Sequence, residues 1–299
     1  MVIVGHRGVG GLLGALAARA GHRVICLSDP DSVADLRVNG LTVRSARHGS
    51  FTVAVESQTR LREPVDVLVV AVKATMLKTA LDRVAPEALG AGTVLALLNG
   101  VEHMAPLRAR YPASQVVAGA IWPDLVDAGS SGVDYIIATA GIELASDTAP
   151  RGRIDGLADL LRPLGIDVTV CQDEAAMLLA KLAFVGPLAL LCTYWEQAPD
   201  GLRRDWRPEM LAAIEEAVAV ARAAGASIDT TAVVALFDEL PPGMKSSMHR
   251  DFEAGRPTEL DALGGALLRE AARRGIEVPG TDRLVTVLRA REPRASVDA

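Results

Sequence analysis

One charged residue inside a long apolar segment is the first feature of this sequence that could do chemistry. Residues 175–195, AAMLLAKLAFVGPLALLCTYW, contain a single charge, that of Lys181. Desolvation lowers the pKa of a buried lysine, so a lysine in such a segment can exchange its proton near neutral pH. The alternative is a core helix whose lysine extends its ammonium to solvent. The segment alone does not decide between the two.

The same segment is long enough to span a bilayer, which takes about 20 apolar residues. Against a membrane span, a lysine at mid-membrane costs about 2.5–3.5 kcal/mol. In addition, Pro187 interrupts the segment and no positive residues flank it. We therefore predict a helix buried inside a soluble protein.

The composition of the 299 residues is typical of a globular α/β protein with one large or two ordinary domains. A net charge of −6 argues against nucleic acid as the main partner. Cys26, Cys171 and Cys192 form no disulfide pattern or zinc spacing, and no export leader precedes the first strand, so we expect a cytoplasmic protein. Five scattered histidines give no reason to expect a metal.

The N-terminus has the order of a dinucleotide-binding βαβ unit. A short strand precedes the glycine turn GHRGVGG, and a helix, a second strand and then Asp29 follow. Backbone N–H groups at such a turn bind a pyrophosphate, and the residues expected to do so are Gly5, His6, Arg7, Gly8, Val9 and Gly10. Arg7 replaces the middle glycine of G-x-G-x-x-G, so Gly8 or Gly11 must supply the missing freedom. The alternative is a turn that serves only helix–strand packing.

Strands and helices then alternate as far as residue 172, which predicts a parallel, doubly wound sheet of the Rossmann type with a modified far end. The further strands are expected at 41–45, 51–57, 65–73, 93–100, 115–122, 134–144 and 166–170. Lys73 and Asn99 fall at the carboxyl ends of two of them, where ligands of open α/β sheets bind. Asn99 precedes Gly100, so a simple turn is the alternative at that position.

Residues 173–299 lack strand patterns and predict an all-α second domain. Helical periodicity covers 174–195, 208–224 and 259–274. Thr258 is expected to cap the last of these, which places Glu259 in a first turn favourable for a carboxylate. That capping geometry is also the structural alternative to a binding role for Glu259.

These segments resemble the ketopantoate reductase (2-dehydropantoate 2-reductase) family over nearly the whole chain. The motifs that carry the resemblance are the glycine turn, VAVKATM, LLNG, AKLAF, SSMHRDFEAGRPTELD and RRGIEVPGTDRL. The resemblance implies a Rossmann domain (1–172) that binds NAD(P)H and a helical domain (173–299) that closes the substrate cleft.

The resemblance also implies roles for individual residues. Lys181 would be the general acid, with Glu259 beside it in the catalytic and cofactor site. Ser247 would hold substrate, and Lys73 and Asn99 would line the nicotinamide and substrate side. Hydride arriving at a carbonyl carbon places negative charge on its oxygen, which a nearby ammonium can stabilise and protonate.

Two positions depart from the family pattern. Where members carry substrate-binding asparagines one and two turns after the lysine, this chain has Val185 and Ala189, so the substrate wall beside Lys181 becomes apolar. Where members often carry an arginine for a 2′-phosphate, Asp29 favours NADH over NADPH. Arg7 in the glycine turn opposes this preference, because its positive charge could attract the 2′-phosphate of NADPH.

We therefore predict a cytoplasmic, metal-independent NAD(P)H-dependent reductase of a 2-oxo acid or related ketone, with ketopantoate itself not assured. Two alternatives on the same fold are an opine-type imine reductase and a non-catalytic nucleotide-binding sensor. The expected partner is the small-molecule substrate, without nucleic acid or membrane, and the working assumption for assembly is a homodimer.

Overall fold

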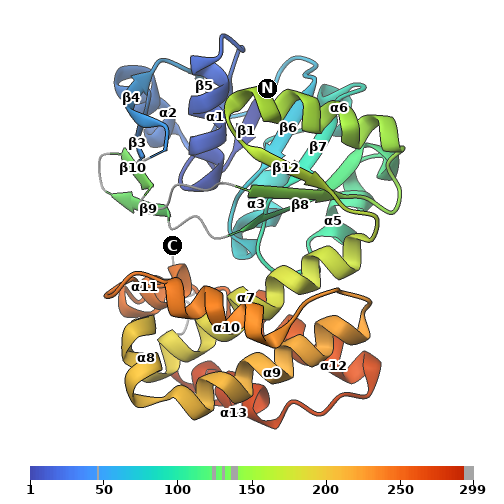
Figure 1. Cartoon of the computed structure of the whole chain (residues 1–299). Helices are drawn as coiled ribbons and strands as arrows, with labels where there is room; N and C mark the ends of the chain where they lie inside the picture. The colour runs from blue at the N-terminus through green and yellow to red at the C-terminus, as the bar shows by residue number, and fades with distance from the viewer. Residues whose placement is uncertain (46, 123–125, 130–131, 136–140, 293–299) are drawn as a thin grey trace. The chain divides into compact units, whose positions relative to one another are not determined.

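The chain folds into two compact units in a computed structural model that describes residues 1–45, 47–122, 126–129, 132–135 and 141–292 (Figure 1). The first unit comprises Met1–Leu98 and His103–Glu174. The second comprises Asn99–Glu102 and Ala175–Ala299. The main division thus falls two residues after the boundary expected at 172, and a four-residue segment of the first half joins the second unit.

The first unit is built on an eight-stranded sheet with the order β12-β11-β8-β7-β6-β1-β2-β5. The strands are β1 (Val2–Val4), β2 (Ile25–Leu27), β5 (Glu56–Gln58), β6 (Val67–Val70), β7 (Thr93–Ala96), β8 (Val116–Trp122), β11 (Gly141–Ala145) and β12 (Asp167–Val170). All neighbours are parallel except β8 and β11, which are antiparallel. The predicted doubly wound sheet with a modified far end is confirmed.

The helices of this unit connect the strands, as βαβ crossovers require. They are α1 (Val9–Arg19), α2 (Pro30–Asn39), α3 (Leu77–Leu81), α4 (Pro86–Leu89), α5 (Met104–Arg110) and α6 (Arg151–Leu161), with 3-10 turns at Ala74–Met76, Ala113–Gln115 and Arg162–Leu164. Every residue of β1, β6 and β7 is buried. Such continuous burial is expected for parallel strands that are covered on both faces.

The strand predicted at 51–57 is wrong as a single element, because the chain changes sheets there. β4 (Gly49–Val53) pairs with β3 (Leu41–Ser45) in a four-stranded sheet that also holds β10 (Gly132–Tyr135) and β9 (Val126–Gly129). The chain then continues into β5, which pairs with β2 of the large sheet. Of the strand expected at 134–144, residues 136–140 lie outside the described residues.

The second unit is helical, as predicted. Its elements are α7 (Glu174–Trp195), α8 (Pro199–Asp205), α9 (Arg207–Ala223), α10 (Thr230–Glu239), α11 (Ser247–Glu253), the π-helix η4 (Asp261–Gly265), α12 (Ala266–Arg274) and α13 (Pro279–Arg291). All but the first residue of α7 belong to this unit. The continuous helix expected at 259–274 is instead a π-helical turn followed by α12.

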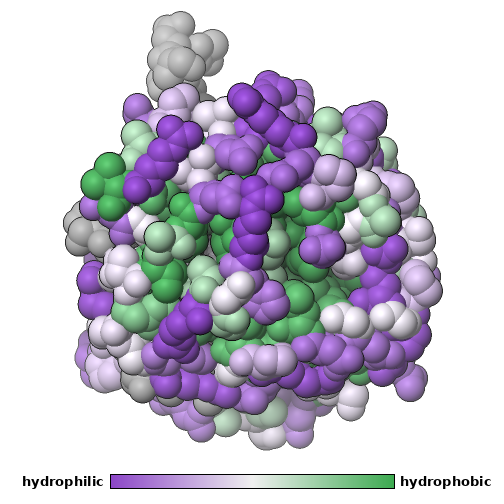
Figure 2. All heavy atoms as spheres, turned by 90° about the horizontal axis from the view of Figure 1, so that it is seen from above, coloured by the Kyte–Doolittle hydropathy of each residue, from purple (hydrophilic) through white to green (hydrophobic). Residues whose placement is uncertain are grey.

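Helix α7 is long and apolar enough to cross a membrane, but 83% of its most apolar window is buried within the structure. A buried core helix passes the same length and composition test as a membrane span, so this helix is weak evidence for a membrane. Figure 2 shows one face of the molecule, on which hydrophilic residues surround smaller hydrophobic areas. Folded surfaces normally retain such apolar areas, and they identify no membrane or partner by themselves.

Candidate active site

The glycine turn after β1 has the backbone that a nucleotide pyrophosphate needs. Gly5 has φ +94°, and a Cβ there would lie 2.4 Å from the Ala71 carbonyl oxygen. A Cβ at Gly10 would lie 2.1 Å from the Gly5 carbonyl oxygen. Gly8 has φ +63° and is the N-cap of α1. Of the two candidates for the missing glycine freedom, Gly8 therefore supplies it, because Gly11 lies within the helix.

These features fit a bound dinucleotide. Gly8 has no side chain to cap α1, so the first backbone N–H groups of this eleven-residue helix can be offered to a phosphate. Burial, followed by the charge of Arg7, holds the pKa of His6 below its ordinary value. Arg7 is exposed and is the permanent cation of the turn.

Asp29 has a structural role at the start of α2 besides its expected place beside the ribose. It follows β2 and is the N-cap of α2, with its Oδ1 accepting from the Ser32 amide at 2.9 Å. The hydroxyls of Ser32 and Ser28 donate to Oδ2 at 2.8 and 3.1 Å. These hydrogen bonds, with the Ser32 amide first, hold the pKa of Asp29 well below its ordinary value. A fixed carboxylate therefore stands at the end of β2, and Pro30 at the next position was the available signal for a cap.

Lys73 lies in the same region of the first unit. It is half-buried, three residues past the end of β6, and it precedes the 3-10 turn Ala74–Met76. Because β6 pairs with β1 in parallel, Lys73 and the glycine turn follow the carboxyl ends of adjacent strands. The chain order of the sheet reverses between these two strands, and doubly wound folds bind their ligands at such a point.

The second unit contains the buried lysine. Lys181 lies on α7 with only 7% of its surface exposed. Burial lowers the pKa of Lys181 from 10.5 to about 8, and the carboxylate of Glu259 opposes this fall. The alternative of a lysine that extends its ammonium to solvent from a core helix is therefore wrong, because the residue is buried.

Asn99 and Glu259 meet in this unit although 160 positions separate them. The Asn99 amide nitrogen donates to Glu259 Oε2 at 3.2 Å. Glu259 is 3% exposed, and its charge favours the protonated form of Lys181. Three of the predicted site residues thus form one group, in which a buried carboxylate accepts an amide hydrogen bond and supports a buried ammonium.

The two positions predicted to make the substrate wall beside Lys181 apolar, Val185 and Ala189, lie on α7. Val185 is half-buried and Ala189 is 4% exposed. The Ala189 carbonyl accepts a hydrogen bond from the Thr193 hydroxyl at 2.7 Å, so this hydroxyl is directed to the helix backbone. Val185 and Ala189, one and two turns after Lys181, therefore offer a substrate no polar side chain.

Ser247 is exposed at the first position of α11, and its assignment to the substrate stays a prediction. The adjacent Ser246 is buried, and its hydroxyl accepts from the His249 amide at 3.2 Å as the N-cap of α11. The Thr258 hydroxyl accepts from the Leu260 amide at 3.2 Å. The N-cap of the next helical element, η4, is Leu260 rather than the expected Thr258.

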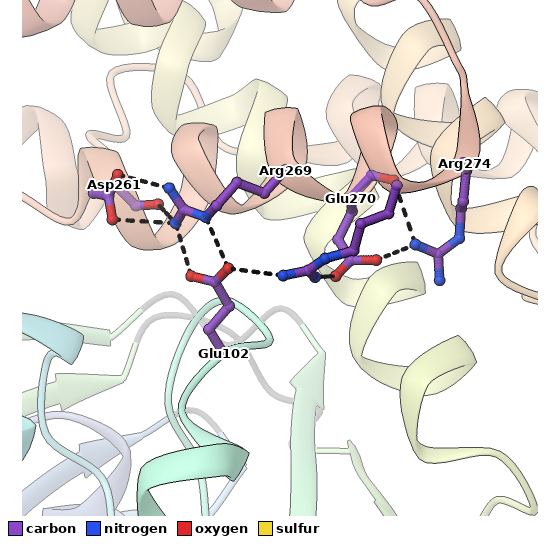
Figure 3. Close-up of polar contacts among 6 residues, drawn as sticks. Glu102, Asp261, Arg269, Glu270 and Arg274 are labelled. Carbon is purple, nitrogen blue, oxygen red and sulfur yellow. Dashed lines mark hydrogen bonds and ion pairs between the residues drawn. The ribbon is translucent and has the colours of Figure 1, made fainter.

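Sequence reasoning missed a group of charged residues next to this site. Glu102, Asp261 and Arg269 form a network in the second unit, drawn in Figure 3. No motif or spacing connects Glu102 with Arg269, which are 167 positions apart, so only the tertiary structure reveals the pairing.

A nucleotide-type glycine turn in one unit and a buried lysine–carboxylate group in a helical second unit define a two-domain oxidoreductase of the Rossmann class. Family models agree with this architecture. The model "Ketopantoate reductase PanE/ApbA" matches residues 1–133, and "Ketopantoate reductase PanE/ApbA C terminal" matches residues 174–292. The chain belongs to the ketopantoate reductase family and is an oxidoreductase of the class that acts on a C=O group.

Individual relatives match over the full length. A 2-dehydropantoate 2-reductase of Mycobacterium tuberculosis (strain ATCC 25618 / H37Rv) is 31% identical, with 97% of each chain covered. The crystal structure of 2-dehydropantoate 2-reductase from Geobacter metallireducens GS-15 is 28% identical and superposes with a TM-score of 0.86, covering 97% of this chain and 98% of that one. A D-mandelate dehydrogenase solved with NADH and anilino(oxo)acetate shares the fold, with 21% identity, a TM-score of 0.85 and 98% of each chain covered.

Proposed function

We propose that this protein reduces a 2-oxo acid with a reduced nicotinamide nucleotide, and that Lys181 is the general acid. The observation that carries the proposal is the buried Lys181 ammonium, whose pKa of about 8 lies close to neutrality, beside the Glu259 carboxylate. A proton donor works best when its pKa is near the working pH.

The chemistry follows from the charge that develops on the substrate. A reduced nicotinamide nucleotide, held at the glycine turn of Gly5, Gly8 and Gly10, would supply the hydride for the carbonyl carbon, so negative charge would develop on the carbonyl oxygen. Lys181 stabilises this charge from an apolar setting, where electrostatic interactions are strong. It then transfers its proton to the oxygen and is reprotonated from solvent. Glu259 keeps Lys181 protonated to a higher pH than burial alone would allow, and Asn99 holds the Glu259 carboxylate.

The choice of substrate follows from the apolar α7 wall. Ketopantoate carries a hydroxyl, and a buried polar group that lacks a partner costs about 1–3 kcal/mol. Val185 and Ala189 offer none, so we expect poor use of ketopantoate and better use of a 2-oxo acid with an apolar tail. The relative from Mycobacterium tuberculosis is named for 2-dehydropantoate, whereas the D-mandelate dehydrogenase was solved with an aromatic oxo acid derivative.

We further propose NADH as the preferred nucleotide and the cytoplasm as the compartment. A 2′-phosphate adds about −1.5 to −2 charges, and the ionised, firmly held Asp29 would repel it. Arg7 attracts the same phosphate and, like Asp29, is exposed. The preference for NADH therefore rests on the hydrogen bonds that fix the Asp29 carboxylate at the end of β2. The three cysteines are free thiols, which supports a reducing compartment.

The direct test is a screen of 2-oxo acids with NADH and with NADPH, followed by loss of absorbance of the reduced nucleotide. Lys181→Ala should lower turnover about 10²–10⁴-fold while nucleotide binding persists. Lys78→Ala, which removes an exposed lysine of the first unit, is the control and should keep parental turnover. Equal turnover in Lys181→Ala and the parent would remove Lys181 from the mechanism. Tight nucleotide binding without turnover of any oxo acid or imine would favour a sensor.

A further inference from the structure

The segment Asn99–Glu102 belongs to the helical second unit, although it directly follows a strand of the sheet. β7 ends at Ala96, and the chain crosses into the second unit at Asn99. Because Asn99 donates to the Glu259 carboxylate, the placement of this short segment sets the geometry of the group around Lys181. The contacts that hold the segment therefore bear on the proposed reaction.

Besides the Asn99 hydrogen bond, a close backbone contact of Gly100 and the ion pairs of Glu102 hold the segment, and one of these pairs joins Glu102 to Arg273 at 3.8 Å. Gly100 has φ +81° and packs so closely on η4 that a Cβ would lie 2.4 Å from the Ala262 carbonyl oxygen. Glu102 accepts two hydrogen bonds from Arg269 of α12, at 2.8 Å from Nε and 2.7 Å from a terminal nitrogen. The segment is thus fixed at both ends, with its backbone pressed against the π-helical turn between them.

Arg269 joins this segment to the start of η4 (Figure 3). Besides Glu102, its guanidinium donates to Asp261 Oδ1 at 3.0 Å, to Oδ2 at 3.1 Å and to the Asp261 backbone carbonyl at 3.1 Å. Gly265 leaves room for this pairing, since a Cβ there would lie 2.4 Å from Asp261 Oδ1. A planar fork of donors can serve two carboxylates and a carbonyl at once, which a lysine cannot do.

Arg269 connects Glu102 and Asp261, which are close in sequence to Asn99 and Glu259, the two partners of the hydrogen bond in the proposed site. Glu102 is three residues after Asn99, and Asp261 is two residues after Glu259. We propose that Arg269 is a positioning residue for the reductase site, acting through Glu102 and Asp261 to fix the separation between Asn99 and Glu259. The proposal rests on the proposed function, and it adds a determinant that lies outside the group around Lys181.

The competing explanation is an ordinary surface ion pair, which contributes little. The chain offers a matched pair for comparison. Arg207 and Asp238 form a two-bond ion pair in the same unit, with side chains 43% and 39% exposed, against 39% and 39% for Arg269 and Glu102. Arg207→Gln therefore removes the same charge at similar exposure without touching the Asn99–Glu259 connection.

The first measurement is amide hydrogen exchange of residues 99–102. Arg269→Gln should accelerate exchange in this segment, and Arg207→Gln should leave it unchanged. Unchanged exchange in Arg269→Gln would overturn the proposal whether or not the protein is a reductase. This readout keeps the proposal testable if the oxo acid screen fails.

The second measurement is a double-mutant cycle on turnover with the best oxo acid. Arg269→Gln should lower kcat about 10- to 100-fold, because small displacements of aligned groups are costly, with less effect on the nucleotide KM. In an Asn99→Ala background the same change should lower kcat less than about twofold, since the Asn99–Glu259 hydrogen bond that Arg269 positions is gone. Arg269→Lys should recover only part of the loss, and Arg207→Gln should stay within about twofold of the parent. Equal effects of Arg269→Gln in both backgrounds, or parental kcat in Arg269→Gln, would overturn the positioning role.

Discussion

Replacing Lys181 with methionine should abolish reduction and remove a pH-dependent cost of folding. Methionine has a similar length and no charge, so it removes the cost of holding an ammonium in an apolar environment. Active sites often retain such destabilising groups because function requires them. The structure gives this cost a magnitude and a pH dependence.

The magnitude follows from the pKa of Lys181. Burial lowers it from 10.5 to about 8, and each pKa unit is worth about 1.36 kcal/mol, so the charged lysine costs the folded state about 3.4 kcal/mol. The unfolded chain binds this proton more tightly than the folded one. The cost is therefore fully present below pH 8 and disappears as the pH rises from 8 to 10.5. In the variant, Glu259 loses its cationic partner, and removing one member of a buried ion pair is itself destabilising. The expected signature is therefore the change with pH of the stability difference between the two proteins.

The assay is urea unfolding of the parent and Lys181→Met at pH 7, 8.5 and 10.5. The difference in unfolding free energy between the two proteins should change by about 3 kcal/mol over this range, in favour of the parent at high pH. Lys78→Met, at an exposed position, should show a difference from the parent that is nearly independent of pH. A constant difference for Lys181→Met as well would refute the assigned burial cost, and with it the reason for a proton donor near neutrality.

Three further predictions concern the reaction itself. In the parent, kcat/KM for reduction should fall above pH 8 as Lys181 loses its proton, and Glu259→Gln should move this fall to lower pH because the carboxylate raises the pKa of Lys181; an unchanged profile would contradict the pairing. Asp29→Arg should shift the ratio of kcat/KM values toward NADPH by about tenfold or more, and a parent that already prefers NADPH several-fold would show that another base governs the ribose site. Val185→Asn combined with Ala189→Asn should improve ketopantoate reduction about tenfold or more relative to an apolar oxo acid; efficient ketopantoate reduction by the parent would contradict the apolar-wall argument.

Local sequence was sufficient for the elements whose structure depends on nearby residues. The glycine turn is readable because a positive φ at Gly5 and the close approach at Gly10 exclude other residues. The alternation of strands and helices identified the doubly wound sheet, and the apolar run of α7 identified a core helix to the residue, at Glu174–Trp195. Each of these signals is a property of one continuous stretch of chain.

Sequence was insufficient wherever the outcome depended on contacts between distant segments. The strand at 51–57 divides between two sheets because its halves find different partners, β3 and β2.

The candidate site shows the same division most clearly. The sequence placed a lysine in an apolar helix, but the size of its pKa change depends on its burial by the fold and on the charge of Glu259, 78 positions away. The Asn99–Glu259 hydrogen bond and the Glu102–Arg269 pair join segments 160 and 167 positions apart. Side-chain chemistry and periodicity are local properties of the chain, whereas desolvation and charge pairing depend on the segments that the fold places next to a residue. The proposed proton donor of this protein needs both the lysine that the local sequence supplies and the environment that the fold supplies.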